Sequence, residues 1–220
     1  MKAILFGSIG TLIETSDLQR EAFNQAFKEA GLDWYWDQED YTKLLKKSGG
    51  TKRVEDFAEK NNTTVDAKKI RERKTQIYNE KINSISLPPR EGVLEVLEFA
   101  NKNNIKTGFV TSTTHDNIDA VFKTLNNQIK KNHFDFIGNN TLIKEPKPAP
   151  DIYIKALNSL ELNPSECIAI EDTVESALSA DRANIKCIAF PGLFHLDDDF
   201  SFCLKKIDKL NVSIFNMLQI

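Results

Sequence analysis

The sequence predicts an α/β protein whose core is a doubly wound parallel sheet, with a helical segment inserted near the amino-terminus. Three observations lead to this prediction. A short apolar run opens the chain and ends in a turn at residues 7–12. Residues 15–86 carry helical periodicity only, whereas strand-like and helix-like segments alternate from residue 87 to residue 190. Strands that alternate with helices of about 10–15 residues are typical of βαβ units and a parallel sheet.

The opening segment, Lys2–Phe6, is short and apolar, as expected for a buried strand. Gly10-Thr11 then predicts a sharp turn into helix-like sequence. In open α/β sheets, ligands bind beyond the carboxyl ends of the strands. The turn after Phe6 is therefore the first candidate for a functional loop.

The next segment, residues 15–86, is predicted to be helical throughout and to form a domain inserted into a core made of residues 1–14 and 87–220. Thr15 or Ser16 can cap its first helix, which Gly31 ends, and alanines and phenylalanines give that helix one apolar stripe. Further helices are predicted around Tyr41–Leu45, after Gly49-Gly50-Thr51, and over about Asp66–Ile82.

The prolines of Leu87-Pro88-Pro89 mark the return to the core. Helices are then predicted over about 93–103, 116–125, 151–160 and 174–183, and strands over 107–110, 134–137, 167–170 and 186–190. Asn184 stands where the end of a helix needs a left-handed residue. The tail beyond Phe194 is acidic and then mixed, and its pattern predicts no element.

The composition indicates a globular protein with a sizeable core. The chain has 220 residues, 40% of them hydrophobic and 28% charged, with a formal net charge of −3. Proteins that bind nucleic acid usually carry a basic stripe or patch, so this charge argues against a nucleic-acid partner.

The three cysteines predict a reducing compartment. Cys167, Cys187 and Cys203 are widely spaced, and two of them lie in apolar runs, which favours buried reduced thiols and a cytoplasmic location. No apolar run approaches the ~18 residues of a membrane span, and the first residues lack a signal-peptide pattern. We therefore expect no membrane partner.

Polar residues follow four of the predicted strands. These are the turn at residues 7–11, the hydroxyl run Thr111–Thr114, the proline-rich loop around Lys147, and the acidic pair Glu171-Asp172. Hydroxyls and backbone N–H groups before a helix can cradle a phosphate, lysine supplies a compact positive charge, and carboxylates suit Mg²⁺. Taken singly, a hydroxyl run is more often a simple turn, and an acidic pair is more often a helix cap.

Together and in this order, the four segments resemble the four motifs of the haloacid dehalogenase (HAD) superfamily. Gly10-Thr11-Leu12 matches the end of its first motif, Asp-x-Asp-Gly-Thr-Leu. The inserted segment is similar to the helical cap of the subgroup that contains β-phosphoglucomutase. The stretches 19–27, 31–36, 44–54, 111–117, 147–153 and 196–200 look most like the CbbY-type sugar-bisphosphate phosphatases.

This resemblance implies a Rossmann-like core, a cap domain, and a Mg²⁺-dependent phosphatase that acts on a phosphorylated sugar, in that family xylulose 1,5-bisphosphate. By position, it implies that Thr111, Ser112 and Lys147 bind the transferring phosphoryl group. It implies Asp172, with Glu171, as metal ligands. In the cap, it implies Gln19, Arg53 and Lys74 as substrate residues, the last two reaching a distal phosphate.

The chain departs from the family pattern at the reacting groups. Gly7 stands at the position of the nucleophilic aspartate, and Ile9 at that of the acid/base aspartate. Gln19, Gly49-Gly50-Thr51 and Ser176 are further departures. In the family, the first aspartate attacks phosphorus and the second transfers protons. Glycine and isoleucine can do neither, so we expect a site that is less negative around Lys147 and that holds Mg²⁺ weakly.

Two other residues are candidate replacements for the missing groups. Ser8 is the nearest hydroxyl, but side chains alternate along a strand, so we expect Ser8 to point away from the side of positions 7 and 9. The sequence also places no base beside it. His115, at a predicted helix start, is more simply an exposed residue.

The preferred hypothesis is a pseudoenzyme: a HAD-type protein that binds inorganic phosphate, a phosphorylated small molecule or a protein partner, and has lost aspartyl-phosphate catalysis. One alternative is an active phosphatase that uses activated water or a reassigned nucleophile. Another is a structural subunit with a vestigial site, since fold alone does not fix function.

Overall fold

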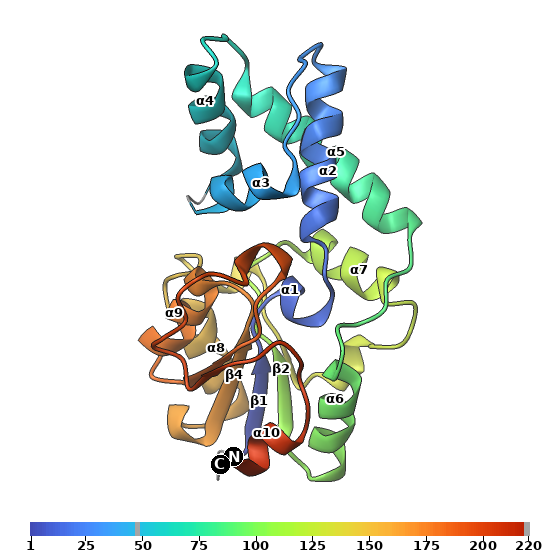
Figure 1. Cartoon of the computed structure of the whole chain (residues 1–220). Coiled ribbons are helices and arrows are strands. Elements are labelled where there is room, and N and C mark those ends of the chain that lie inside the picture. The colour runs from blue at the N-terminus through green and yellow to red at the C-terminus, as the bar shows by residue number, and fades with distance from the viewer. Residues whose placement is uncertain (47–48, 218–220) are drawn as a thin grey trace. The chain divides into compact units, whose positions relative to one another are not determined.

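The computed structural model describes residues 1–46 and 49–217 and forms two compact units. Unit 1 combines Met1–Glu14 with Ser86–Ile220, and unit 2 is Thr15–Ile85. The division lies one residue before the expected boundary at residues 86 and 87. Figure 1 labels the elements of both units.

Unit 1 is built on six parallel strands in the order β3-β2-β1-β4-β5-β6. The strands are β1 (Ala3–Phe6), β2 (Lys106–Phe109), β3 (Phe136–Ile137), β4 (Cys167–Glu171), β5 (Lys186–Ala189) and β6 (Lys205–Lys206). The α-helices in the described part of unit 1 are α1 (Ile9–Leu12), α6 (Val93–Lys102), α7 (His115–Thr124), α8 (Asp151–Leu160), α9 (Val174–Arg182) and α10 (Ser213–Met217). The predicted α/β class with a parallel sheet is confirmed.

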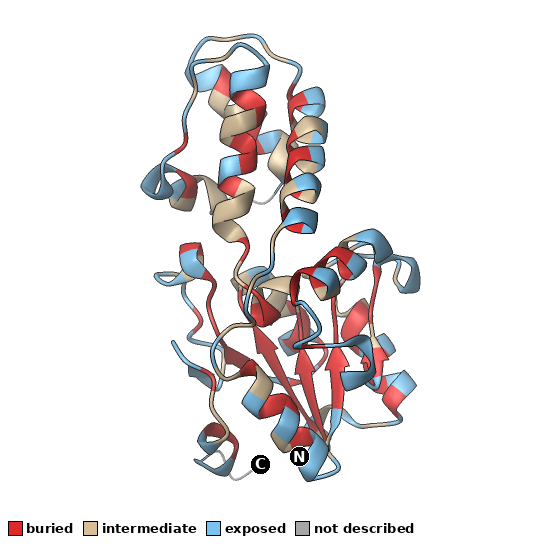
Figure 2. Cartoon of the chain, turned by 90° about the vertical axis from the view of Figure 1, so that its right-hand side faces the viewer, coloured by how far each residue is buried: buried red, intermediate tan, exposed pale blue. Residues whose placement is uncertain are grey.

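The central strands of the unit 1 sheet are mostly apolar and are covered on both faces. All four residues of β1 are fully buried, and Figure 2 shows the central strands mostly in the colour of buried residues. Alternate positions of β1, β4 and β5 pack with α8 and α9 in one core cluster, including Leu5, Ala169 and Cys187. Strands buried on both faces are typical of parallel sheets between helices.

The turn before α6 depends on Gly92, which has φ +88° and lies against the backbone of the carboxyl-terminal tail. A Cβ atom at this position would stand 1.7 Å from the carbonyl oxygen of Leu210. We expect Gly92→Ala to destabilise unit 1 by about 2–3 kcal/mol, because it combines an unfavourable φ with a backbone clash. Urea denaturation measures this loss. Gly31 has φ +74°, and a Cβ atom added there would meet nothing within 4 Å, so Gly31→Ala is the control for φ alone. Equal losses in the two variants would contradict the clash.

Unit 2 is a group of helices around an aromatic core. They are α2 (Ser16–Glu29), α3 (Gln38–Leu45), α4 (Gly50–Lys60) and α5 (Ala67–Ser84). The apolar stripe predicted for α2 is buried, and the ring centroid of Phe27 lies 4.6 Å from that of Trp36. Edge-to-face and tilted ring pairs of this kind add to the burial of apolar surface.

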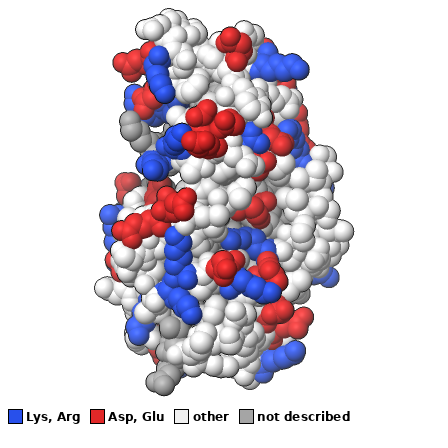
Figure 3. All heavy atoms as spheres, in the orientation of Figure 1, with Lys and Arg blue, Asp and Glu red and all other residues white. Residues whose placement is uncertain are grey.

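Charges of both signs intermingle on the face drawn in Figure 3, with no extended patch of one sign. No helix in the described part of the chain has the length and apolar character needed to cross a membrane.

Candidate functional site

The carboxyl ends of β1, β2 and β4 bring three of the predicted loops together. Phe6 pairs with Phe109 on one side and with Ile170 on the other. Beyond the strand, the N–H of Gly7 donates to the carbonyl of Ile170 at 2.9 Å, and the N–H of Val110 donates to that of Phe6 at 2.7 Å. Gly7, Glu171 and the segment that follows Val110 therefore start at the same edge of the sheet.

Lys147 reaches this edge from the loop before α8. Its Nζ donates to the carbonyl oxygen of Gly7 and to Oε1 of Glu171, both at 2.5 Å. The hydroxyl of Tyr153 donates to the same Oε1 at 2.6 Å. The Lys147 side chain is 7% exposed and that of Glu171 is 0% exposed. Lys147 is thus already paired with a buried carboxylate.

The carboxyl group of Glu171 fills the volume that a side chain at position 7 would take. A Cβ atom on Gly7 would stand 1.9 Å from Oε1 of Glu171 and 2.0 Å from its Cδ. Burial raises the pKa of Glu171, and the charge of Asp172 raises it further, while Lys147 and Tyr153 oppose both effects. Lys147 therefore faces the carboxylate of Glu171, which the resemblance implied as a metal ligand. That the site is less negative because positions 7 and 9 carry no carboxylate stays a prediction.

Ser8 does not point away from this group, which corrects the expectation from strand alternation. Its Oγ hydrogen bonds to Oδ1 of Asp172 and lies 3.2 Å from Oε2 of Glu171. Strand β1 ends at Phe6, so the alternation of side chains does not extend to position 8. No base is adjacent to Ser8 in the sequence, but the fold brings the Asp172 carboxylate, 164 positions away, into contact with its hydroxyl.

Two further residues fix the turn after β1. A Cβ atom on Gly10 would stand 1.8 Å from Oδ2 of Asp172, so only glycine permits this approach. Arg90 donates to the carbonyl oxygens of Gly10, Phe190 and Pro191 at 2.7–2.8 Å. Sequence reasoning missed Arg90 and Tyr153. Arg90 follows a proline pair without any motif, and Tyr153 lies inside an apolar helix pattern.

The hydroxyl run lies between β2 and α7. Thr111 is buried and its Oγ1 accepts from the N–H of Thr113 at 3.3 Å, while Ser112 is half-buried. Thr114 caps α7 by accepting from the N–H of Asn117. Ile9, at the start of α1, is half-buried and presents only a hydrocarbon side chain.

Unit 2 brings three cationic side chains together: Arg53 from α4, and Arg71 and Lys74 from α5. Nζ of Lys74 donates to Oε1 of Gln19 at 2.9 Å and lies over the rings of Phe23 and Tyr78. Burial, together with the charges of Arg71 and Arg53, lowers the pKa of Lys74 to about 7.

Arg53 of the same unit is also buried and lies near Arg71. Its Nε donates to the carbonyl oxygen of Leu44 at 2.9 Å. Burial lowers the pKa of Arg53, and Arg71 lowers it further. Gln19, Arg53 and Lys74, which the resemblance implied, thus lie in one cluster. Arg71 was missed because nothing in the pattern of α5 distinguishes it from the exposed cations around it.

The oxygen atoms at the sheet edge are candidate ligands for a metal ion. Among the described residues, no group of three or more His, Cys, Asp and Glu side chains is placed to bind one ion. Lys147 engages Oε1 of Glu171, which leaves Oε2, the carboxylate of Asp172 and the hydroxyl of Ser8. Mg²⁺ is often held by one or two carboxylates plus water and substrate phosphate, so this donor set fits Mg²⁺ with few protein ligands.

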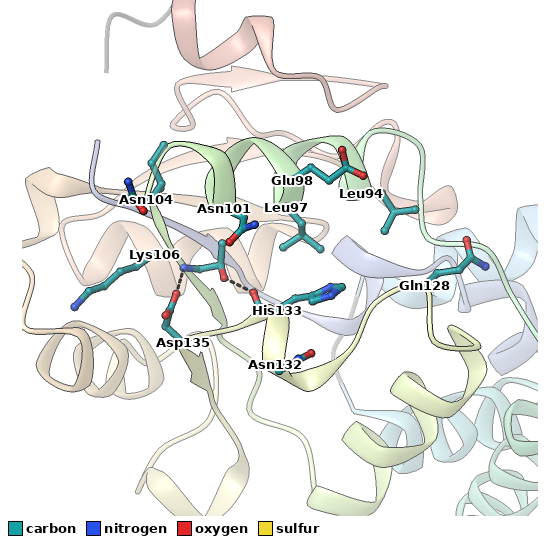
Figure 4. A pocket seen from close by; sticks show the side chains of 12 residues that line it. Leu94, Leu97, Glu98, Asn101, Asn104, Lys106, Gln128, Asn132, His133 and Asp135 are labelled. Atoms are coloured by element: carbon teal, nitrogen blue, oxygen red, sulfur yellow. Dashed lines mark hydrogen bonds between the residues drawn. The ribbon is translucent and has the colours of Figure 1, made fainter.

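A cavity of about 620 Å³ lies elsewhere in unit 1 (Figure 4). Its lining includes Leu97 of α6, Lys106 and Thr107 at the amino end of β2, and His133 and Asp135. The loops described above follow the carboxyl ends of the strands. This cavity therefore lies at the opposite end of β2 from the candidate site.

Comparisons with known proteins agree with this geometry. The family model "Haloacid dehalogenase-like hydrolase" matches residues 4–190. Protein CbbY of Rhodobacter capsulatus is 35% identical over 216 residues, which cover 97% of this chain and 95% of that protein. Protein CbbY of Cereibacter sphaeroides is 30% identical, with 94% and 92% covered.

Solved structures are similar over the same length. CbbY from Rhodobacter sphaeroides in complex with phosphate has a TM-score of 0.78 and 30% identity, and covers 95% of this chain and 94% of its own. A mutant of that protein in complex with xylulose-(1,5)bisphosphate aligns with the same values. A putative β-phosphoglucomutase from Thermotoga maritima, at 21% identity and a TM-score of 0.73, shares the fold. The chain therefore belongs to the haloacid dehalogenase-like hydrolase family and, within it, is CbbY-like.

Proposed function

We propose that this protein binds phosphate or a sugar phosphate at the carboxyl edge of the unit 1 sheet and does not form an aspartyl-phosphate there. One observation carries the proposal. Position 7 has no side chain, and its volume is filled by the Glu171 carboxylate, which is fully buried and held by Lys147 and Tyr153. A carboxylate in that position cannot reach a phosphorus atom in solution, so the step that opens aspartyl-phosphate catalysis has no nucleophile.

The ligand class follows from the donors at the edge. We assign phosphate binding to Thr111, Ser112, the N–H groups that precede α7, and Lys147. Helix amino-termini and lysine both favour phosphate. The complexes of CbbY with phosphate and with xylulose-(1,5)bisphosphate support this ligand class. Because Lys147 is paired with Glu171, a phosphate at this site competes with that carboxylate for the ammonium group.

The cationic cluster of unit 2 is proposed as a second anion-binding group. The charges of Arg53, Arg71 and Lys74 lie close enough to lower the pKa of Arg53 and of Lys74. A bound phosphate would relieve that repulsion, and Gln19 is placed to orient Lys74. The inserted unit is proposed to be a substrate-binding cap, as the resemblance implies.

Mg²⁺ is proposed as a weakly bound partner of the phosphate. Asp172 and Oε2 of Glu171 would hold it. When bound, the ion neutralises phosphate charge and polarises the phosphoryl group. The chain's own residues supply the rest: Lys147 binds, and the segment from Thr111 to the start of α7 orients the anion.

Calorimetric titration tests the proposal. Inorganic phosphate and a sugar phosphate are expected to bind with and without Mg²⁺. Lys147→Met is expected to weaken binding by about 10–100-fold, because a charged hydrogen bond is lost. Lys155→Met, at an exposed lysine of α8, is the matched control and should bind as the wild type does. Thermal unfolding of each variant establishes that it is folded. An absence of binding heat with either ligand, in both metal conditions, would refute the proposal.

A further inference from the structure

The environment of the Ser8 hydroxyl is unusual for a serine at the start of a helix. Ser8 precedes α1 with extended backbone at φ −147°, yet its side chain makes no capping hydrogen bond to that helix. Its Oγ is instead directed to the carboxylates of Asp172 and Glu171. A serine whose only role is to cap would bond the free N–H groups of the helix. The contacts of Ser8 therefore need another explanation.

Exposure distinguishes Ser8 from the groups around it. Glu171 is fully buried, the Asp172 residue is 8% exposed, and Lys147 is largely covered. Ser8 as a residue is half-buried, so it is less covered than either carboxylate residue that it contacts. Glu171 is also held by three partners, namely Lys147, Tyr153 and Ser8. Of the two side chains that lie around position 7, the hydroxyl and not the carboxylate is placed to act on a bound phosphate.

Asp172 supplies the base that a hydroxyl nucleophile needs. A carboxylate that accepts the proton of an attacking hydroxyl is the arrangement used in phosphoryl transfer to alcohols. Asp172 is positioned in turn by the close approach of Gly10, and the N–H of Gly192 donates to its backbone carbonyl at 3.1 Å. The hydroxyl and its base thus come from two adjacent strand ends that the fold holds in register.

We propose that Ser8 is the phosphoryl acceptor of this chain and that Asp172 is its general base when no Mg²⁺ is held there, because a carboxylate that binds the ion is a poor proton acceptor. The inference rests on the proposed phosphate binding and deepens it. In this step Oγ of Ser8 bonds to phosphorus and the ester P–O bond breaks. The Ser8 proton passes to the Asp172 carboxylate and from there to the leaving alkoxide. A phosphate monoester and serine give phosphoserine and an alcohol, with no redox change and no further reactant.

The test is covalent phosphorylation of the full chain. The protein is incubated with p-nitrophenyl phosphate, with and without Mg²⁺, and its intact mass and p-nitrophenol release are followed. We expect a mass gain of one phosphoryl group, release of one p-nitrophenol for each chain modified, and fragment masses that place the group on Ser8. Ser8→Ala should abolish the adduct, and Asp172→Asn should slow its formation by about 10²–10⁴-fold. Ser8→Thr, which keeps a hydroxyl, should retain it.

The controls separate this inference from the binding proposal. Ser165→Ala, at an exposed serine of unit 1, should be modified as the wild type is. Thermal unfolding of Ser8→Ala establishes that this variant is folded, and phosphate binding by the wild type is measured in the calorimeter beside it. A wild-type chain that binds phosphate and gains no mass would overturn the role of Ser8 and leave the binding proposal intact. An adduct that persists in Ser8→Ala would overturn it as well. If neither binding nor an adduct is found, both proposals fail.

Discussion

Glu171→Ala is expected to destabilise unit 1 by about 3–5 kcal/mol, and adding Gly7→Asp is expected to recover a large part of that loss. Removing the carboxylate leaves the ammonium of Lys147 buried without its partner, which is the costly way to break a buried ion pair. It also leaves the Tyr153 hydroxyl without an acceptor. In the double variant, an aspartate side chain starts where the Glu171 carboxyl group stood, within reach of Lys147.

Gly7→Asp alone is expected to destabilise as well, because its Cβ meets the Glu171 carboxyl group at 1.9 Å and adds a second buried carboxylate. We expect the double variant to lose less free energy of unfolding than the sum of the losses of the two single variants. The difference is the coupling energy between the two substitutions, and we expect it to be about 2 kcal/mol or more. Urea denaturation of the four proteins of this cycle measures it. Gly7→Ala with Glu171→Ala is the matched control, since it refills the volume without a charge and should recover little. Strictly additive losses would show that Glu171 is not the group that compensates Lys147.

Unit 2 is expected to become more stable as the pH rises from 7 to 10, and Lys74→Met is expected to remove most of that change. The pKa of Lys74 is lowered from 10.5 to about 7 by burial and by Arg71 and Arg53. Between these two values the unfolded chain holds a proton on Lys74 that the folded chain has released. Stability therefore increases with pH by up to ~1.4 kcal/mol per unit, on the order of 4 kcal/mol over the whole window.

Urea denaturation at several pH values between 7 and 10 measures this slope for the wild type and the variant. Lys69→Met is the matched control, because Lys69 lies on the same helix with an exposed side chain and should leave the slope unchanged. Saturating phosphate should flatten the wild-type slope if the anion binds the cluster, since a nearby anion raises the pKa of Lys74 toward its ordinary value. A wild-type slope no steeper than that of Lys74→Met would contradict the charge state inferred for this lysine.

Sequence patterns predicted those helices and strands whose capping residues, turn residues and apolar periodicity match their burial in the fold. Helix α8 has the expected bounds, because a proline-rich loop fixes its start and its apolar stripe is regular. Asn184 has the left-handed conformation expected after α9, with φ +58°. Strand β6 had no signal, since it consists of two exposed lysines that pair with β5 only through the backbone.

For the candidate site, sequence order located the loops and could not orient the side chains within them. In parallel sheets, functional loops follow the carboxyl ends of the strands. This rule predicted a common sheet edge for Gly7, Thr111 and Glu171, which follow adjacent strands. Ser8 turns to Asp172 because β1 ends before position 8. Glu171 fills the space beside Gly7 because position 7 has no side chain to occupy it. Neither property is periodic, so no pattern of residue types encodes it.

The chain leaves unit 1 and comes back to it at one point. The N–H of Arg90 donates to the carbonyl oxygen of Leu12 at 2.8 Å, so two residues on either side of the whole insertion are direct neighbours. A short linker in place of the insertion can therefore join these two positions, and the entropy lost on closing such a short loop is small. Unit 1 is consequently suited to production as a single continuous polypeptide without the insertion, in which the chemistry of its sheet edge can be studied by itself.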